Sequence, residues 1–177
     1  MALQRYVIDG YGQLELNAVA FRRSGRIEAQ CKIADGIEYV ENGMLLAVDN
    51  VERVVKYVAE GENLPVALNY TTEHMYDERQ KGLKYFRLNA GEHLPRMGYQ
   101  GAGDKYTTNC LAYDTDEFAN EEALMTALDN IKTTPLYAKV CALGAHQITK
   151  TATDAVALVI AKTTMPDGQV AVKFQAL

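Results

Sequence analysis

The sequence predicts a mainly β fold: a β-barrel or β-tulip-like core with one amphipathic helix and an extended N-terminal arm. Three observations support this prediction. Short runs of β-branched and aromatic residues recur between glycine and proline turns. Only one segment has a convincing helical period. The first 35 residues sustain neither period, so we expect an arm over residues 1–35 and a single β-rich domain over residues 36–177.

Length and composition restrict the class of protein. The 177 residues are 48% hydrophobic, which is enough to bury the core of one domain. The net charge of −5 argues against a protein that coats nucleic acid, because phosphate binding depends on clustered lysine and arginine. The sequence shows no signal peptide and no apolar run of about 18 residues, so we expect the protein in the cytoplasm or in a particle assembled there.

Cysteine and serine usage restricts the chemistry. Cys31, Cys110 and Cys141 show no CxxC spacing and leave one thiol unpaired in any intramolecular scheme, which favours reduced thiols that act as small apolar side chains. Ser24 is the only serine, and no GxSxG motif surrounds it. A serine hydrolase is therefore excluded.

Residues 1–35 combine short apolar patches with glycines and a basic cluster of Arg22, Arg23 and Arg26. One interpretation is an arm that gains order from a neighbouring subunit. The other is a pair of short edge strands joined by a solvated turn. The arginines are the one candidate for nucleic-acid contact, but no aromatic stacking platform accompanies them.

Three strands are expected in the next third of the chain. Met44–Val48 is an apolar run and Val51–Val58 is rich in β-branched residues, so the intervening Asp49 and Asn50 predict a hairpin. Leu64–Tyr70 is the third strand. All three precede the glycine-rich centre of the chain.

The polar segment Thr71–Lys81 is expected to form one or two helical turns. Within it, Glu73, His74, Asp77 and Glu78 are side chains able to bind a metal. The HExxH pattern is absent, so a solvated polar turn is favoured over a metal site.

The central stretch predicts two strands around a glycine turn. Leu83–Asn89 and Tyr106–Thr108 have strand-like composition. Gly101 and Gly103 resemble half of a phosphate-binding loop, but the GxGxxG spacing fails and a strand follows where a helix would have to begin. We therefore expect a tight turn at these glycines.

The C-terminal part predicts one helix and three strands. Asn120–Ile131 has a capping asparagine, two acidic residues in its first turn and one apolar face. The expected strands are Leu136–Leu143, Ala155–Thr163 and Gln169–Gln175. Met165–Gly168 is a proline-initiated turn that ends in glycine, which predicts an antiparallel hairpin of the last two strands.

No catalytic, cofactor-binding or metal site is predicted. Cys141 and His146 are close in sequence, but Cys141 lies in an apolar strand pattern typical of an inert thiol. The eleven tyrosines are spread along the expected strands, which is typical of a half-buried sheet surface or an assembly interface.

Several segments resemble the small β-rich capsid-associated proteins of tailed bacteriophages, and the nearest type is the head decoration or cement protein. The segments are Gly43–Asp49, Leu83–Asn89, Pro95–Tyr99, Gly103–Asn109 and Met165–Gln175. The resemblance implies a non-enzymatic virion protein, assembled in the host cytoplasm, that binds and stabilises a capsid lattice. Its expected partners are the major capsid protein and copies of itself. It implies no cofactor and no catalysis. We also expect no small-molecule substrate and no membrane contact, and the net charge disfavours nucleic-acid contact.

Two other classes of function stay open. The first is a small β-barrel module that binds oligonucleotides through Arg22, Arg23, Arg26 and exposed tyrosines. The second is a small-molecule enzyme built around His74 or Cys141. A steep salt dependence of single-strand binding would distinguish the first alternative from a capsid protein.

Overall fold

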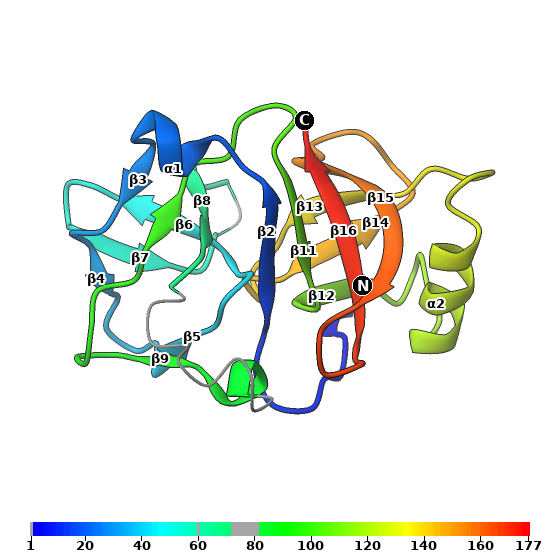
Figure 1. The fold of residues 1–177 in the computed structure, drawn as a ribbon, viewed down its shortest axis with the longest axis horizontal. Helices are drawn as coiled ribbons and strands as arrows, with labels where there is room; N and C mark the ends of the chain where they lie inside the picture. The colour runs from blue at the N-terminus through cyan, green and yellow to red at the C-terminus, as the bar shows by residue number, and fades with distance from the viewer. Residues whose placement is uncertain (1, 60, 72–81) are drawn as a thin grey trace.

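The structure is a computed structural model that describes residues 2–59, 61–71 and 82–177. It contains an eight-stranded sheet, a six-stranded sheet and a two-stranded ribbon. In Figure 1 the six-stranded sheet lies on the left, the eight-stranded sheet on the right, and strand β2 stands upright in front, between them. The prediction of a mainly β fold is confirmed.

The eight-stranded sheet is antiparallel except for one pair of strands. Its order is β1 (Leu3–Arg5), β12 (Leu111–Asp114), β14 (His146–Thr149), β13 (Tyr137–Val140), β15 (Ala157–Thr164), β16 (Val170–Ala176), β11 (Lys105–Thr108) and β2 (Leu14–Ala18). Strands β12 and β14 are parallel. Strands β1 and β2 are opposite edges, so the pairing among the described strands does not close a barrel.

The six-stranded sheet has two-residue strands at both edges. Its order is β3 (Ile27–Glu28), β10 (Met97–Gly98), β8 (Val66–Asn69), β6 (Leu45–Asp49), β7 (Val54–Lys56) and β4 (Lys32–Ile33). The separate ribbon pairs β5 (Tyr39–Val40) with β9 (Leu88–Asn89).

The N-terminal segment is part of both large sheets. Strands β1 and β2 form the two edges of the eight-stranded sheet, and β3 and β4 form the two edges of the six-stranded sheet. For the described residues 2–35, the structure therefore shows the edge-strand alternative, in place of an arm extended away from its own chain. Contact of this segment with a neighbouring subunit stays a prediction.

The first predicted hairpin is confirmed, with a longer turn than expected. Strands β6 and β7 are antiparallel, and Asp49 lies opposite Val54. The Asp49 carboxylate accepts the backbone N–H groups of Val51 and Glu52, each at 3.0 Å. This side chain organises a turn over residues 50–53, so β7 begins three residues later than the β-branched run suggested.

The C-terminal hairpin and the main helix are also confirmed. Strands β15 and β16 pair antiparallel across the Met165–Gly168 turn, in which Met165 N–H donates to the Gln169 carbonyl at 2.8 Å. Helix α2 (Glu121–Asp129) is the longest helix among the described residues. Asn120 caps it by accepting the Ala123 N–H at 2.8 Å.

Two expectations for the strands were wrong. Leu83–Asn89 is a 3₁₀ turn (η2, Gly82–Tyr85) followed by the two residues of β9. The reason is that only β5 is available to pair with this segment, and β5 has two residues. Strand β14 was not expected, because its short sequence HQIT has no apolar run and gains its strand form from β12 and β13 on either side.

The two sheets share their apolar interior. One buried cluster joins Tyr106 and Phe174 of the eight-stranded sheet to Leu68 of the six-stranded sheet and to the α2 side chains Leu124 and Leu128. A second buried cluster joins side chains of β6, β7 and β10 to those of β12. Because both clusters cross between the sheets, neither sheet has a core of its own among the described residues.

Candidate functional site

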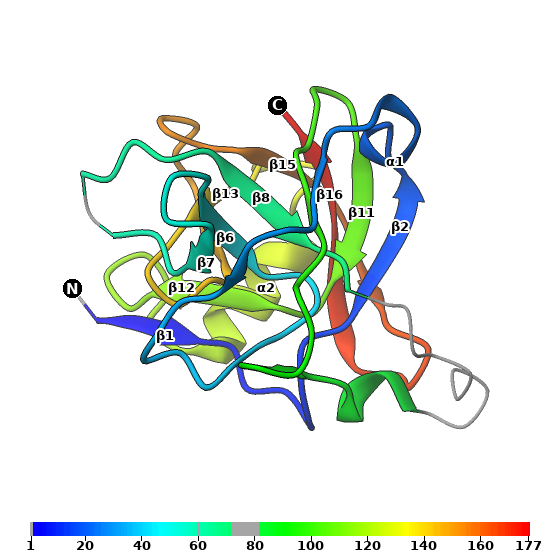
Figure 2. The ribbon, with the colours of Figure 1, turned by 90° about the vertical axis from the view of Figure 1, so that its left-hand side faces the viewer.

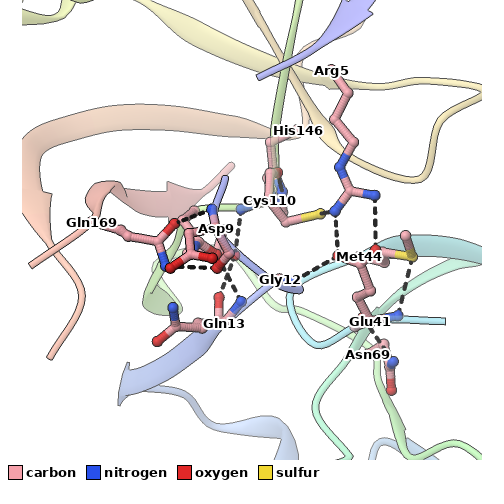
Figure 3. Close-up of polar contacts among 12 residues, drawn as sticks. Arg5, Asp9, Gly12, Gln13, Glu41, Met44, Asn69, Cys110, His146 and Gln169 are labelled. Atoms are coloured by element: carbon pink, nitrogen blue, oxygen red, sulfur yellow. Dashed lines mark hydrogen bonds and ion pairs between the residues drawn. The ribbon is translucent and has the colours of Figure 1, made fainter. Parts of the chain in front are cut away.

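The central polar contact among the described residues is a partly buried ion pair between Arg5 and Glu41 (Figure 3). Arg5 donates through Nη1 to Glu41 Oε1 at 3.0 Å and through Nη2 to the other carboxylate oxygen. Glu41 is only 3% exposed. It also accepts the Gly12 N–H at 2.6 Å, while its own carbonyl accepts from Asn69 Nδ2 at 2.9 Å. The pair therefore fastens β1 and the β1–β2 loop to the six-stranded sheet.

The surroundings of this ion pair keep the nearby thiol protonated. Arg5 Nη2 lies 3.6 Å from Cys110 Sγ. Burial raises the pKa of Cys110 to about 12, against the weaker lowering effect of Arg5. Burial alone would lower the pKa of Arg5, but its contacts with Cys110 and Glu41 hold that pKa above the ordinary value. Arg5 is thus a permanent cation, and Cys110 is a poor nucleophile at neutral pH.

A second polar network fixes the loop between β1 and β2 (Figure 3). Asp9 N–H donates to Gln169 Oε1 at 2.7 Å, and Gln169 Nε2 returns a bond to the Asp9 carbonyl at 3.0 Å. Lys84 makes an ion pair with the Asp9 carboxylate. Gln13 Nε2 donates to Asp167 at 2.8 Å. The N-terminal loop is therefore held against the β15–β16 turn.

His146 is fully buried at the centre of the eight-stranded sheet. Its Nε2 lies 2.8 Å from the Tyr106 hydroxyl, its Nδ1 lies 3.3 Å from the Cys110 carbonyl, and its ring stacks on Phe174 with 4.6 Å between centroids. Burial lowers the pKa of His146 to about 4. The ring is therefore neutral at pH 7 and packs as a core side chain.

The structure gives Cys141 and His146 different partners. Cys141 Sγ donates to the Ala145 carbonyl at 3.2 Å, and burial raises the pKa of this thiol. Cys31 is a free, buried thiol as well. These three cysteines behave as apolar side chains, as the sequence predicted.

The metal-binding candidates of the polar segment, Glu73, His74, Asp77 and Glu78, lie outside the described residues. Within the ranges that the structure describes, no group of three or more histidine, cysteine, aspartate or glutamate side chains could hold a metal ion. The same ranges contain no helix long and apolar enough to cross a membrane.

A basic groove lies between β2 and the short helix α1 (Phe21–Ser24). Its volume is about 1030 Å³, and its lining consists of residues 16–20 and 22–24 together with Asp104. The structure brings Arg22 and Arg23 to this groove, and neither guanidinium group makes a hydrogen bond or an ion pair with another described residue. Arg26 is not part of the lining and donates through Nε to Ser24 Oγ at 3.1 Å.

Among the described residues, Asp104 is the one acidic side chain that lines this groove, and it is held in place by two backbone N–H groups. Its carboxylate accepts the Ala20 N–H at 2.8 Å and the Gly101 N–H at 2.9 Å. Asp104 N–H in turn donates to the Gly101 carbonyl at 3.0 Å. The glycines therefore form the tight turn that the sequence predicted. The groove has a net positive charge because Arg22 and Arg23 outnumber Asp104 in its lining.

Sequence reasoning did not find the Arg5–Glu41 pair or the Asp9–Gln169 network. Their members are 36 and 160 residues apart in sequence, and no local pattern connects them. Comparisons with protein-family models, with curated proteins and with solved structures find no match. The function must therefore be argued from the molecule itself.

Proposed function

We propose that the protein is a non-enzymatic structural component of a bacteriophage particle, a decoration protein that binds and stabilises a capsid lattice. Its partners would be the major capsid protein and further copies of itself. The observation that supports this proposal best is that each large sheet ends in short, partly exposed strands supplied by the first 35 residues. Such edges can contact neighbouring chains repeatedly across a lattice.

The chemistry of the polar residues agrees with a structural role. Arg5, Glu41 and Gln169 form bonds that fasten the N-terminal segment to the sheets. His146 and Cys110 are buried, with pKa values that keep them neutral at pH 7. These side chains hold the fold together, and a structural protein needs no more from them.

Co-sedimentation with expanded phage heads tests the proposal. We expect the purified protein to sediment with heads and to stay bound at about 0.5 M salt, because backbone pairing and apolar contacts are screened less than exposed charges. Protein that remains in the supernatant with heads of every candidate phage would contradict the proposal.

Nucleic-acid binding is the second candidate, and the observation that favours it is the groove position of Arg22 and Arg23, whose side chains have no ion-pair partner among the described residues. Such binding must release counterions and therefore fall steeply with salt. The capsid proposal predicts no measurable affinity for single strands at physiological salt. Micromolar affinity that disappears when Arg22, Arg23 and Arg26 become alanine would favour the nucleic-acid module instead.

A further inference from the structure

We propose that the open edge of β2 and the basic groove beside it form a strand-addition site for an extended, acidic segment of a partner protein. The inference rests on the proposed function in that the partner is taken to be a lattice protein. It adds the surface that is used, the conformation of the ligand and the sign of its charge.

The backbone of β2 has one unpaired side. Figure 2 shows β2 next to β11 at the margin of the eight-stranded sheet, with α1 above its end. Gln13 N–H donates to Asn109 Oδ1 at 2.7 Å, and the Gln13 carbonyl accepts from Thr108 Oγ1 at 2.6 Å, so both backbone groups of Gln13 face the β11 side. Directions alternate along a strand, so the backbone groups of Leu14 and Leu16 face away from β11.

No other described strand pairs with this side of β2. Strand β2 pairs with β11, and no other described backbone group bonds to the backbone of residues 14–18. Exposure rises along the strand, from the buried Leu14 to the exposed Asn17 and Ala18. The open edge therefore leads directly into the groove.

Part of the edge is protected, which limits where a partner can pair. Lys105 of β11 lies opposite Ala18, and the next residue, Tyr106, lies opposite Leu16. Asn17 is therefore the extra residue of a β-bulge, which bends β2. Leu14 is buried, so backbone pairing is expected at the half-buried Leu16, followed by side-chain contacts in the groove over residues 18–24. A segment of about six to eight residues fits this combination.

The charges select an acidic segment. Arg22 and Arg23 line the groove with no ion-pair partner among the described residues, and Asp104 is engaged by two backbone N–H groups. Glu15 is not among the lining residues. Carboxylates of a partner are therefore expected beside Val19 and Ala20 and not beside Glu15, because guanidinium groups form paired bonds with carboxylates.

A polypeptide suits this site better than a nucleic acid. A row of alternating N–H and C=O groups is recognised by another extended backbone. The groove lining contains leucine, valine and alanine side chains but no aromatic ring on which a base could stack.

Peptide titration of the intact protein tests the site directly. The probe is a capped peptide of about eight residues in which valine and threonine alternate with glutamate. Two control peptides carry glutamine in place of glutamate, or N-methyl groups on alternate backbone nitrogens. We expect saturable binding of the acidic peptide below about 1 mM, weaker binding of the glutamine peptide and no binding of the N-methylated peptide. Absence of binding, or equal binding of the N-methylated peptide, would overturn the proposal.

A charge variant tests the groove. Arg22→Gln/Arg23→Gln should weaken binding of the acidic peptide about threefold to tenfold, as expected for two solvent-accessible ion pairs. The matched control is Lys132→Gln/Lys139→Gln, which removes the same charge near α2 and β13, far from β2 in the sheet order. An equal loss in the control would show that the attraction is non-specific and would overturn the site.

Two other ligands of this site, a nucleic acid and a second copy of the chain, would give different results in the same experiments. A single-stranded oligonucleotide that competes with the acidic peptide and binds more tightly would assign the groove to nucleic acid. Self-association that the Arg22→Gln/Arg23→Gln variant abolishes would assign the edge to a second copy of the chain. Either result would overturn the proposal for an acidic partner segment.

The head sedimentation assay separates this inference from the proposed function. If the wild-type protein and the arginine variant sediment equally with heads, the decoration role stands and the strand-addition site is wrong. If the wild-type protein binds the acidic peptide but ignores heads, the site stands and the decoration role is wrong.

Discussion

At the residue scale, the buried His146 makes stability depend on pH. Its pKa is lowered to about 4 in the folded protein from an ordinary value of 6.5, so the unfolded chain takes up the proton first as pH falls. The contribution to stability is therefore complete above pH 6.5 and is lost progressively toward pH 4. Since one pKa unit corresponds to about 1.4 kcal/mol, the loss approaches about 3 kcal/mol.

Calorimetry of the wild-type protein and of a His146→Gln variant between pH 4.5 and 7.5 measures this effect. Other groups also make the folded protein less stable in acid. At Asp167, burial raises the pKa, but bonds from Gln169 and Gln13 outweigh this effect and lower it, so protonation of this carboxylate destabilises the fold. Those losses are common to both proteins. We expect the difference in stability between wild type and variant to shrink as pH falls, and a constant difference would contradict the role of His146.

The Arg5–Glu41 pair gives a second prediction at this scale. Glu41→Gln leaves the Arg5 cation without its counter-charge in a largely buried position, which should cost about 3 kcal/mol of unfolding free energy. The amide oxygen of glutamine can still accept the Gly12 N–H, so the loss reports the charge pair. Adding Arg5→Met should recover part of the loss, as measured by urea denaturation of both single variants and the double variant. Additive losses would show that the pair is not coupled.

At the element scale, α2 depends on two leucines for its attachment to the sheet. Leu124 and Leu128 are 0% and 1% exposed, and both belong to the cluster shared with Phe174. Leu124→Asp or Leu128→Asp places an unpaired charge in this contact and should cost several kcal/mol, about the penalty for a buried charge without a partner.

Thr126→Asp is the matched control for these helix variants, because Thr126 is exposed on the same helix. We expect the control to melt within a few degrees of the wild type in thermal denaturation followed by circular dichroism. Unchanged melting of the leucine variants would show that α2 is not docked.

At the scale of the whole molecule, the N-terminal segment supplies the edge strands of both large sheets, and we expect folding to require it. Removing residues 2–35 would delete all four edge strands of the two large sheets and the Arg5 partner of Glu41. We expect this truncation to yield no cooperatively folding protein. Limited proteolysis of the full chain should leave residues 2–35 intact under native conditions, because cleavage concentrates in unanchored backbone. A stable core that begins near residue 36 would support an arm instead.

The sequence alone was sufficient for features that depend on neighbouring residues. The Asn120 cap, the apolar face with Leu124 and Leu128, and the proline-initiated turn at Met165–Gly168 are local signals, and the structure shows each of them. The tight glycine turn before β11 is local as well. In each case the residues that determine the conformation lie within one helical turn or one reverse turn of each other.

Tertiary structure alone decided the features that depend on distant partners. Residues 2–35 show no sustained period because an edge strand pairs on one side only and needs a few residues, so their place in both sheets could not be read locally. The form of β14, the Arg5–Glu41 pair and the place of Asp104 beside Arg22 and Arg23 depend on chain segments that meet only in the fold. Local propensity cannot encode such meetings, because their energy comes from burial and pairing between residues far apart in sequence.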